Sequence, residues 1–207
     1  MWDVFTTSAL PSHVPVEKPA GTYRVFLMGA STAYGLGGLW THIDPDHPVL
    51  CMDEQPVQLI KETRRPIPAT RRHAKRVDYE YERAGTASIF MFTEPLSGWR
   101  EATACATKTK RDWAVEVARL LEGRYHKCST VTLVCDNLNT HTIGAFYEAF
   151  PPARARALVR RLRFCHTPKH GSWLNIAENE LSSLTRQCVA GRRFDKLPAL
   201  QPELAAW

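Results

Sequence analysis

The chain has 207 residues, of which 44% are hydrophobic and 23% charged, and its formal net charge is +6 at neutral pH. This composition excludes a largely disordered chain and a collagen-like one, and the length suits one domain with a sizeable core plus a smaller appendage. No run approaches the roughly 20 apolar residues of a membrane span, and the first forty residues lack a secretory signal pattern. We therefore expect no membrane contact and a cytoplasmic location.

The positive charge mildly favours a polyanionic partner such as DNA. Two segments concentrate the basic residues, 61–76 and 154–163. Such clusters neutralise phosphates, but a solvated helix face or loop explains either cluster equally well. The six cysteines show no CxxC pair and no zinc-finger spacing, so we expect them to be reduced and buried, without a structural zinc site.

Residues 1–46 are rich in Pro, Gly, Ser and Thr and show no sustained helical or strand period. Gly35, Gly37 and Gly38 resemble a phosphate loop superficially, but no Lys-Ser/Thr pair follows them. We expect an irregular or disordered leader over 1–46 and one folded domain over 47–207.

From Pro48 onward, strands and helices alternate. A short apolar strand, Val49–Met52, ends on Asp53, and a Pro- and Arg-rich loop follows it. Two further strands flank Gly98 and favour an antiparallel hairpin. In chain order we expect strands at 49–52, 87–93 and 99–107, a helix at 110–125, a strand at 131–135, helices at 143–150 and 154–161, a strand at 162–166, and helices at 173–189 and 202–207. This order is that of the ribonuclease H-like fold, an α/β fold with a mixed five-stranded sheet and helices on both faces.

Three acidic residues stand out by their placement. Asp53 ends the first strand, Asp136 ends the fourth, and Glu178 lies in the first turns of a long helix. If the first and fourth strands are parallel neighbours, both aspartates emerge at the same edge of the sheet. Glu54 and Glu180 are rival acids beside two of these positions.

Clustered carboxylates repel one another, and a divalent cation relieves that repulsion. Oxygen ligands select Mg²⁺ or Mn²⁺, and two such ions support an in-line phosphodiester displacement. The arrangement therefore favours phosphoryl transfer. An aspartate that closes a strand is also often a turn former or a helix N-cap, so position alone is a weak signal.

Three local sequences make the case more specific. They are Cys-Met-Asp-Glu-Gln-Pro at 51–56, Cys-Asp-Asn-Leu-Asn-Thr-His at 135–141 and Thr-Pro-Lys-His-Gly-Ser-Trp-Leu-Asn-Ile-Ala-Glu at 167–178. In this order they resemble the three motif blocks of IS630-family transposases, in the Tc1/mariner group of DDE enzymes. The resemblance runs from about Pro48 to Arg193.

The resemblance implies that Asp53, Asp136 and Glu178 are the catalytic acids and the ligands of a two-metal Mg²⁺ or Mn²⁺ site. Ile176 and Ala177 stand where related members often carry Pro and Ile, which leaves the acid in register. The interval between the second and third acids is longer than in mariner relatives, which we interpret as an Arg-rich insert.

The same blocks supply further candidates that orient a metal ligand or touch DNA. Asn137, Asn139 and His141 follow the second acid. For His141, a local hydrogen bond at a helix start is an equally good interpretation. Lys169, His170 and Trp173 lie in the loop before the third acid, and for Trp173 a role as core anchor of the last helix is favoured.

The implied activity is cleavage at transposon ends by activated water, followed by attack of the 3′-hydroxyl on target DNA at TA sites. The implied partners are double-stranded DNA and a second copy, as a homodimer. Residues 1–46 show no paired helical periods, so we expect a catalytic core without the helix-turn-helix domain that normally recognises the ends, and autonomous transposition is doubtful. Two alternatives stay open: a catalytically silent DNA-binding remnant, or another ribonuclease H-like nuclease.

Overall fold

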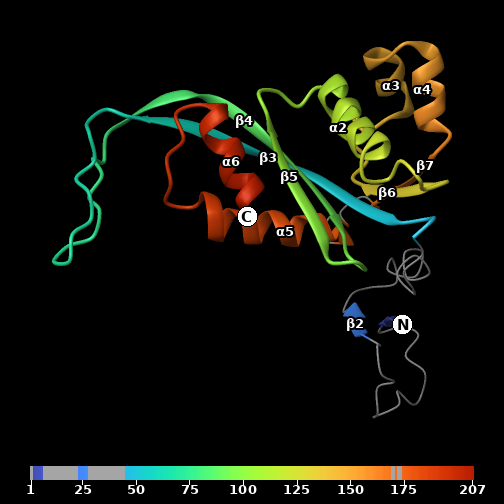
Figure 1. Cartoon of the computed structure of the whole chain (residues 1–207), viewed down its shortest axis with the longest axis horizontal. Coiled ribbons are helices and arrows are strands. Elements are labelled where there is room, and N and C mark those ends of the chain that lie inside the picture. Colours follow the sequence, from blue (N-terminus) through green and yellow to red (C-terminus); the bar gives the residue numbers. More distant parts are fainter. Residues whose placement is uncertain (1, 7–22, 28–44, 169–170, 172–173) are drawn as a thin grey trace.

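A mixed five-stranded sheet forms the centre of the molecule (Figure 1). The computed structural model describes residues 2–6, 23–27, 45–168, 171 and 174–207. The strands are β3 (Val49–Glu62), β4 (Tyr81–Glu94), β5 (Trp99–Cys105), β6 (Val131–Cys135) and β7 (Leu162–His166), in the order β5-β4-β3-β6-β7. β4 is antiparallel to β3 and β5, whereas β6 is parallel to β3 and β7. The predicted antiparallel hairpin is confirmed, and Gly98 supplies its turn with a φ of +71°.

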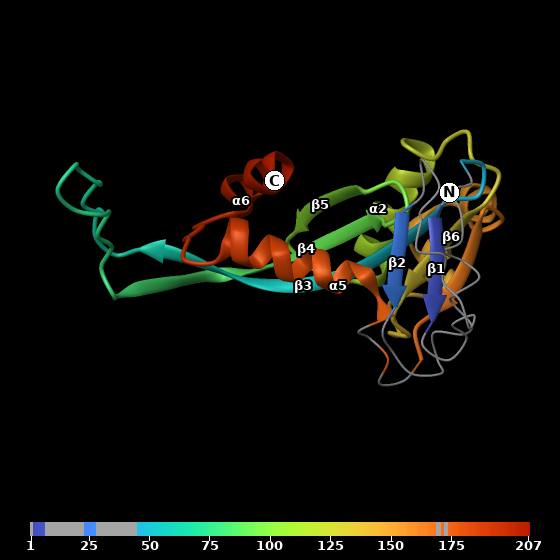
Figure 2. The ribbon, with the colours of Figure 1, turned by 90° about the horizontal axis from the view of Figure 1, so that it is seen from below.

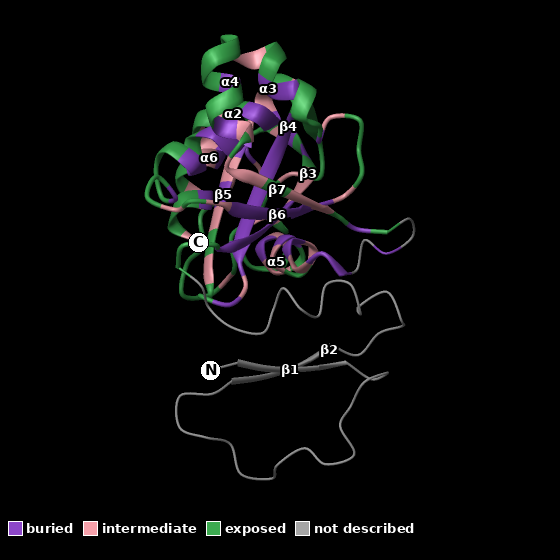
Figure 3. Ribbon diagram, turned by 90° about the vertical axis from the view of Figure 1, so that its right-hand side faces the viewer, coloured by how far each residue is buried: buried purple, intermediate pink, exposed green. Residues whose placement is uncertain are grey.

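Helices cover both faces of this sheet, as predicted. One face carries α2 (Lys110–Glu122), α3 (Ile143–Ala149) and α4 (Pro152–Val159), and the other carries α5 (Ile176–Leu184), a π-helical turn (Thr185–Val189) and α6 (Leu197–Ala206). Alternate side chains of the strands enter two separate cores, because successive residues of a strand point to opposite faces. Phe90 and Phe92 pack toward α2, and Ile89 and Met91 pack toward α5. Figure 3 shows the buried strands between the two helical layers.

The first strand is longer than predicted. It was expected to end at Asp53, but β3 continues to Glu62 because β4 pairs with it from Cys51 opposite Thr93 to Glu62 opposite Tyr81. Pro56 is tolerated because the β6 ladder stops at Cys51, so β3 has a ladder partner on one side there. The outer parts of β3 and β4, with the loop 63–80, form an arm that projects from the body (Figure 2).

The base of this arm is fastened to the segment that follows the π-helical turn. The backbone N–H of Ile60 donates to the carbonyl of Phe194 at 2.7 Å. Arg193 forms an ion pair with Glu62 at 2.6 Å and donates to the carbonyl of Asp78 at 2.7 Å. These contacts protect the outer part of the β3 edge that β6 leaves unpaired.

Two of the basic residues in segment 154–163 have structural roles. Arg161 donates to the carbonyls of Leu121, Tyr125 and Cys128, and so satisfies acceptors at and beyond the C-terminal end of α2. Arg154 forms an ion pair with Glu122 at 2.7 Å. The remaining arginines of this segment have exposed side chains that can contact phosphate. They are Arg156, Arg160 and Arg163.

Near the N-terminus, β1 (Trp2–Thr6) and β2 (Tyr23–Leu27) pair in parallel, and the sequence did not predict these strands. Residues 7–22 and 28–44 lie outside the described residues, so the irregular leader over 1–46 stays a prediction. Within the described residues, no helix is long and apolar enough to cross a membrane. All six cysteines are free, but Cys105, Cys128 and Cys165 are half-buried, so the prediction that all are buried was wrong for these three.

Candidate active site

The register between β3 and β6 brings Asp53 and Asp136 to the same level. The paired residues run from Val49 opposite Thr132 to Cys51 opposite Val134, and each aspartate lies two residues beyond the last pair. The predicted parallel neighbours are confirmed. β6 ends just before Asp136, as predicted, whereas Asp53 lies within the continuing strand β3.

Glu178 lies in the first turn of α5. The N-cap residue of this helix holds that first turn against β3. Asn175 is the N-cap: its side-chain oxygen accepts from the N–H of Ala177, and its amide donates to the carbonyl of Met52 at 2.7 Å. Asn175 is 1% exposed. The helix predicted from Trp173 therefore begins at Ile176, next to the strand residue that precedes Asp53.

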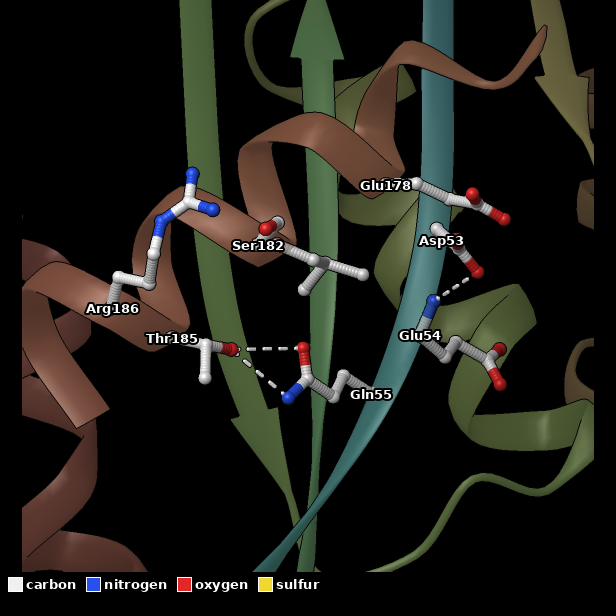
Figure 4. A pocket seen from close by; sticks show the side chains of 8 residues that line it. Asp53, Glu54, Gln55, Glu178, Ser182, Thr185 and Arg186 are labelled. Carbon is white, nitrogen blue, oxygen red and sulfur yellow. Dashed lines mark hydrogen bonds between the residues drawn. The ribbon is translucent and has the colours of Figure 1, made fainter. Parts of the chain in front are cut away.

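Asp53 and Glu178 share a cavity of about 420 Å³. Figure 4 shows their carboxylates on the same side of β3, while the side chain of Glu54 points away from them. The other lining residues are Gln55, Leu181, Ser182, Thr185 and Arg186, with Glu54 at the margin. Gln55 and Thr185 exchange side-chain hydrogen bonds at 3.0 and 3.1 Å across this cavity, and Arg186 is exposed at its far end.

The charges of Asp136 and Glu178 act on the carboxyl group of Asp53. Burial, helped by the charges of Asp136, Glu178 and Glu54, raises the pKa of Asp53 to about 6. The N–H of Glu54, which donates to the Asp53 carboxylate at 2.7 Å, acts in the opposite direction. The charged form of Asp53 is thus unfavourable in the metal-free site. A cation placed among these carboxylates relieves that cost.

His141 lies between Asp136 and Glu54. Its Nε2 is 2.9 Å from Glu54 Oε1, and its Nδ1 is 2.7 Å from Asp136 Oδ1 and 3.2 Å from the Asp136 carbonyl. Burial lowers the pKa of His141, but hydrogen bonds with Asp136, Cys135 and Glu54 outweigh burial and raise it to about 11. Both interpretations offered for His141, a local hydrogen bond and contact with a candidate metal ligand, agree with this geometry.

The remaining predicted residues divide into two groups. Asn137 and Asn139 are exposed in the loop that follows β6, beside Asp136. Lys169, His170 and Trp173 lie outside the described residues, so their roles stay predictions.

Each rival acid has a partner of its own. Glu180 forms an ion pair with Arg100 at 3.0 Å, and Glu54 pairs with His141. Sequence reasoning missed Asn175, Gln55 and Arg186 as site residues. An asparagine just before an apolar helical run is an N-cap signal that could have identified Asn175.

The donors suit a hard divalent cation, although they do not form a finished ligand set. Among the described residues, no group of three His, Cys, Asp or Glu side chains is arranged so that it could hold a metal ion. Asp136 Oδ1 is buried and receives no hydrogen bond, despite its ion-pair contact with His141. Mg²⁺ or Mn²⁺ would suit this place, where a buried carboxylate oxygen without a hydrogen bond lies beside an aspartate whose pKa is raised. Waters or phosphate oxygens would complete the ligand shell of the ion.

Comparison with family models decides the class. The model described as DDE superfamily endonuclease matches residues 48–201. The chain belongs to this family. The matched residues include all three candidate acids, the whole sheet and the helices up to the first half of α6. A search of curated proteins found no match.

Solved structures support the ribonuclease H-like fold of this DDE domain. The Mos1 strand transfer complex matches with a TM-score of 0.51 at 15% identity, over 81% of this chain and 49% of that chain. The Mos1 transposase paired-end complex with left transposon end matches with a TM-score of 0.50 at 14% identity, over 78% and 48%. The Mos1 mariner paired end complex with Mn is also similar, with a TM-score of 0.49 at 15% identity, over 78% and 48%. The chain thus spans about half the length of these structures.

Proposed function

We propose that this DDE domain is the catalytic core of a transposase of the IS630 and Tc1/mariner group, and that it cleaves and joins strands of double-stranded DNA. The observation that carries the proposal is the placement of three acids: Asp53 within β3, Asp136 directly after its parallel neighbour β6, and Glu178 on a helix capped against β3. The family match and the three motif blocks support it.

In this proposal Asp53, Asp136 and Glu178 hold two Mg²⁺ or Mn²⁺ ions. Such ions, when bound, activate a water or a 3′-hydroxyl and stabilise the leaving oxygen of a phosphodiester displacement. The chain's own contribution is placement: the strand register sets the two aspartates, and the Asn175 cap sets Glu178. Arg186 lines the cavity beside them and is exposed, and there it would pair with a DNA phosphate.

In this proposal the arm provides a second surface for contacts with DNA. The loop 63–80, which projects from the body (Figure 2), exposes six basic residues: Arg64, Arg65, Arg71, Arg72, Lys75 and Arg76. These side chains would add phosphate contacts without base specificity. The same arm exposes Ile67, Val77 and Tyr79, an apolar surface that supports a homodimer as part of the proposal.

A calorimetric Mn²⁺ titration tests the metal site. We expect saturable binding that is lost in Asp136→Asn and in Glu178→Gln. The matched control is Glu180→Gln, on the same helix, whose carboxylate is paired with Arg100 and whose loss leaves Mn²⁺ binding unchanged. Equal binding by wild type and all three variants would exclude this site.

A second candidate is a catalytically silent DNA-binding domain. It is favoured by one observation, the lack of a finished three-residue ligand cluster within the described part of the chain. The two candidates separate when the titration is repeated with a short DNA duplex. Mn²⁺ binding that appears with DNA supports the catalytic proposal, and DNA binding without any Mn²⁺ uptake supports the silent domain.

A further inference from the structure

The buried carboxylate of Glu54 has no evident role in the proposed chemistry. Its side chain is 3% exposed, and its partner His141 is 1% exposed. Side chains alternate along β3, so Glu54 points to the α2 face together with Met52, while Asp53 points to the α5 face together with Cys51. Although Glu54 also lines the cavity, its carboxylate points away from those of Asp53 and Glu178 (Figure 4).

A buried carboxylate without a partner is costly, and here the partner is the histidine that also contacts Asp136. Nε2 of His141 is 2.9 Å from Glu54 Oε1, and Nδ1 is 2.7 Å from Asp136 Oδ1. Nδ1 is also 3.2 Å from the backbone carbonyl of Asp136, so the imidazole is fixed in orientation at both ends. The imidazole also stacks on Trp113 of α2, with ring centroids 5.3 Å apart.

From this geometry we infer that Glu54 is a positioning residue, which acts through His141 to fix the carboxylate of Asp136. Asp136 needs such support because it follows the end of β6, where the ladder no longer restrains the backbone. Its side chain is 33% exposed, whereas both residues behind it are buried. Outer partners of this kind commonly change metal affinity by 10–100-fold when they are removed.

This inference rests on the proposed metal site, so its test combines a metal measurement with a metal-free one. The variants are Glu54→Gln and His141→Gln, with Asp136→Asn for comparison and Trp113→Phe as a control that disturbs packing on the same imidazole. Each is checked for folding by circular dichroism. Mn²⁺ affinity is measured by calorimetry, and the ¹³C carboxyl resonance of Asp136 is recorded without metal.

We expect Glu54→Gln and His141→Gln to weaken Mn²⁺ binding about tenfold or more and to shift the Asp136 resonance, with binding restored at high Mn²⁺. Trp113→Phe should leave both readouts close to wild type. His141→Asn is the conservative variant, because its amide nitrogen replaces Nδ1: it should retain more of the Asp136 signal and affinity than His141→Gln.

Two results would overturn the inference. In the first, Glu54→Gln leaves both the Mn²⁺ affinity and the Asp136 resonance unchanged. In the second, it abolishes Mn²⁺ binding as completely as Asp136→Asn, with no recovery at high Mn²⁺, which makes Glu54 a ligand. If the wild type binds no Mn²⁺ even in the presence of a DNA duplex, the proposed function fails by itself. The Asp136 resonance then decides the positioning role: a shift in Glu54→Gln supports it, and no shift overturns it.

Discussion

The side-chain amide of Asn175 donates to the carbonyl of Met52 at 2.7 Å, and this buried bond ties the start of helix α5 to strand β3 one residue before Asp53. The same side chain caps α5 through the N–H of Ala177. Asn175 therefore helps to set the distance between Glu178 and Asp53, together with the apolar packing of α5 on the sheet.

The first prediction concerns this bond. Asn175→Asp keeps an oxygen for the helix cap but cannot donate to the Met52 carbonyl, and Asn175→Ala loses both contacts. We expect Asn175→Ala to lose about 1–3 kcal/mol in the free energy of unfolding, and Asn175→Asp to lose more, because its buried carboxylate faces the Met52 carbonyl. Chemical denaturation measures this. Unchanged stability in both variants would show that the helix is held by packing alone.

The second prediction concerns pH. The folded-state pKa of Asp53 lies near 6, above its ordinary value, so its stabilising contribution is full below the unfolded pKa and is lost as the pH rises through 6. Asp53→Asn mimics the neutral form. In the presence of a chelator we expect this variant to be more stable than wild type at pH 7.5, by on the order of 2 kcal/mol. The difference should shrink toward zero at pH 4. A difference that is independent of pH would contradict the assignment.

The third prediction separates two neighbouring arginines. Arg161→Gln removes hydrogen bonds to three buried or half-buried carbonyls, and we expect it to lower the free energy of unfolding by about 2–4 kcal/mol. Arg160→Gln is the matched control. Its side chain is exposed, so stability should change by less than about 0.5 kcal/mol. Thermal denaturation of the two variants, side by side, provides the comparison.

The fourth prediction concerns the arm. The double variant Arg71→Gln/Arg72→Gln removes two positive charges from the arm. It should leave the free energy of unfolding unchanged, because both side chains are exposed in the projecting loop. DNA affinity should fall, and the slope of log affinity against log salt should decrease by about 1–2. Fluorescence anisotropy with duplex DNA at several salt concentrations measures both quantities. An unchanged salt slope would remove the arm from the DNA path.

The sequence predicted much of the sheet because apolar runs such as Val131–Cys135 are short, continuous and bounded by polar residues. The extension of β3 past Asp53 was missed since Glu54, Gln55 and Pro56 interrupt the apolar pattern. Their strand conformation depends on pairing with β4, which is a tertiary effect. In the site, the two aspartates followed from strand ends, but the Glu54–His141 pair joins residues far apart in sequence, and nothing local signals it.

The central claim is that Asp53, Asp136 and Glu178 together perform metal-dependent DNA cleavage. The most direct measurement is the conversion of supercoiled plasmid to nicked circles with Mg²⁺, with Mn²⁺ and with chelator, for wild type and for Asp53→Asn, Asp136→Asn and Glu178→Gln, beside the Glu180→Gln control. We predict nicking that requires the divalent cation, is lost in each of the three variants and persists in the control. Nicking that survives in all three variants, or a folded, DNA-bound wild type that never nicks, would contradict the account.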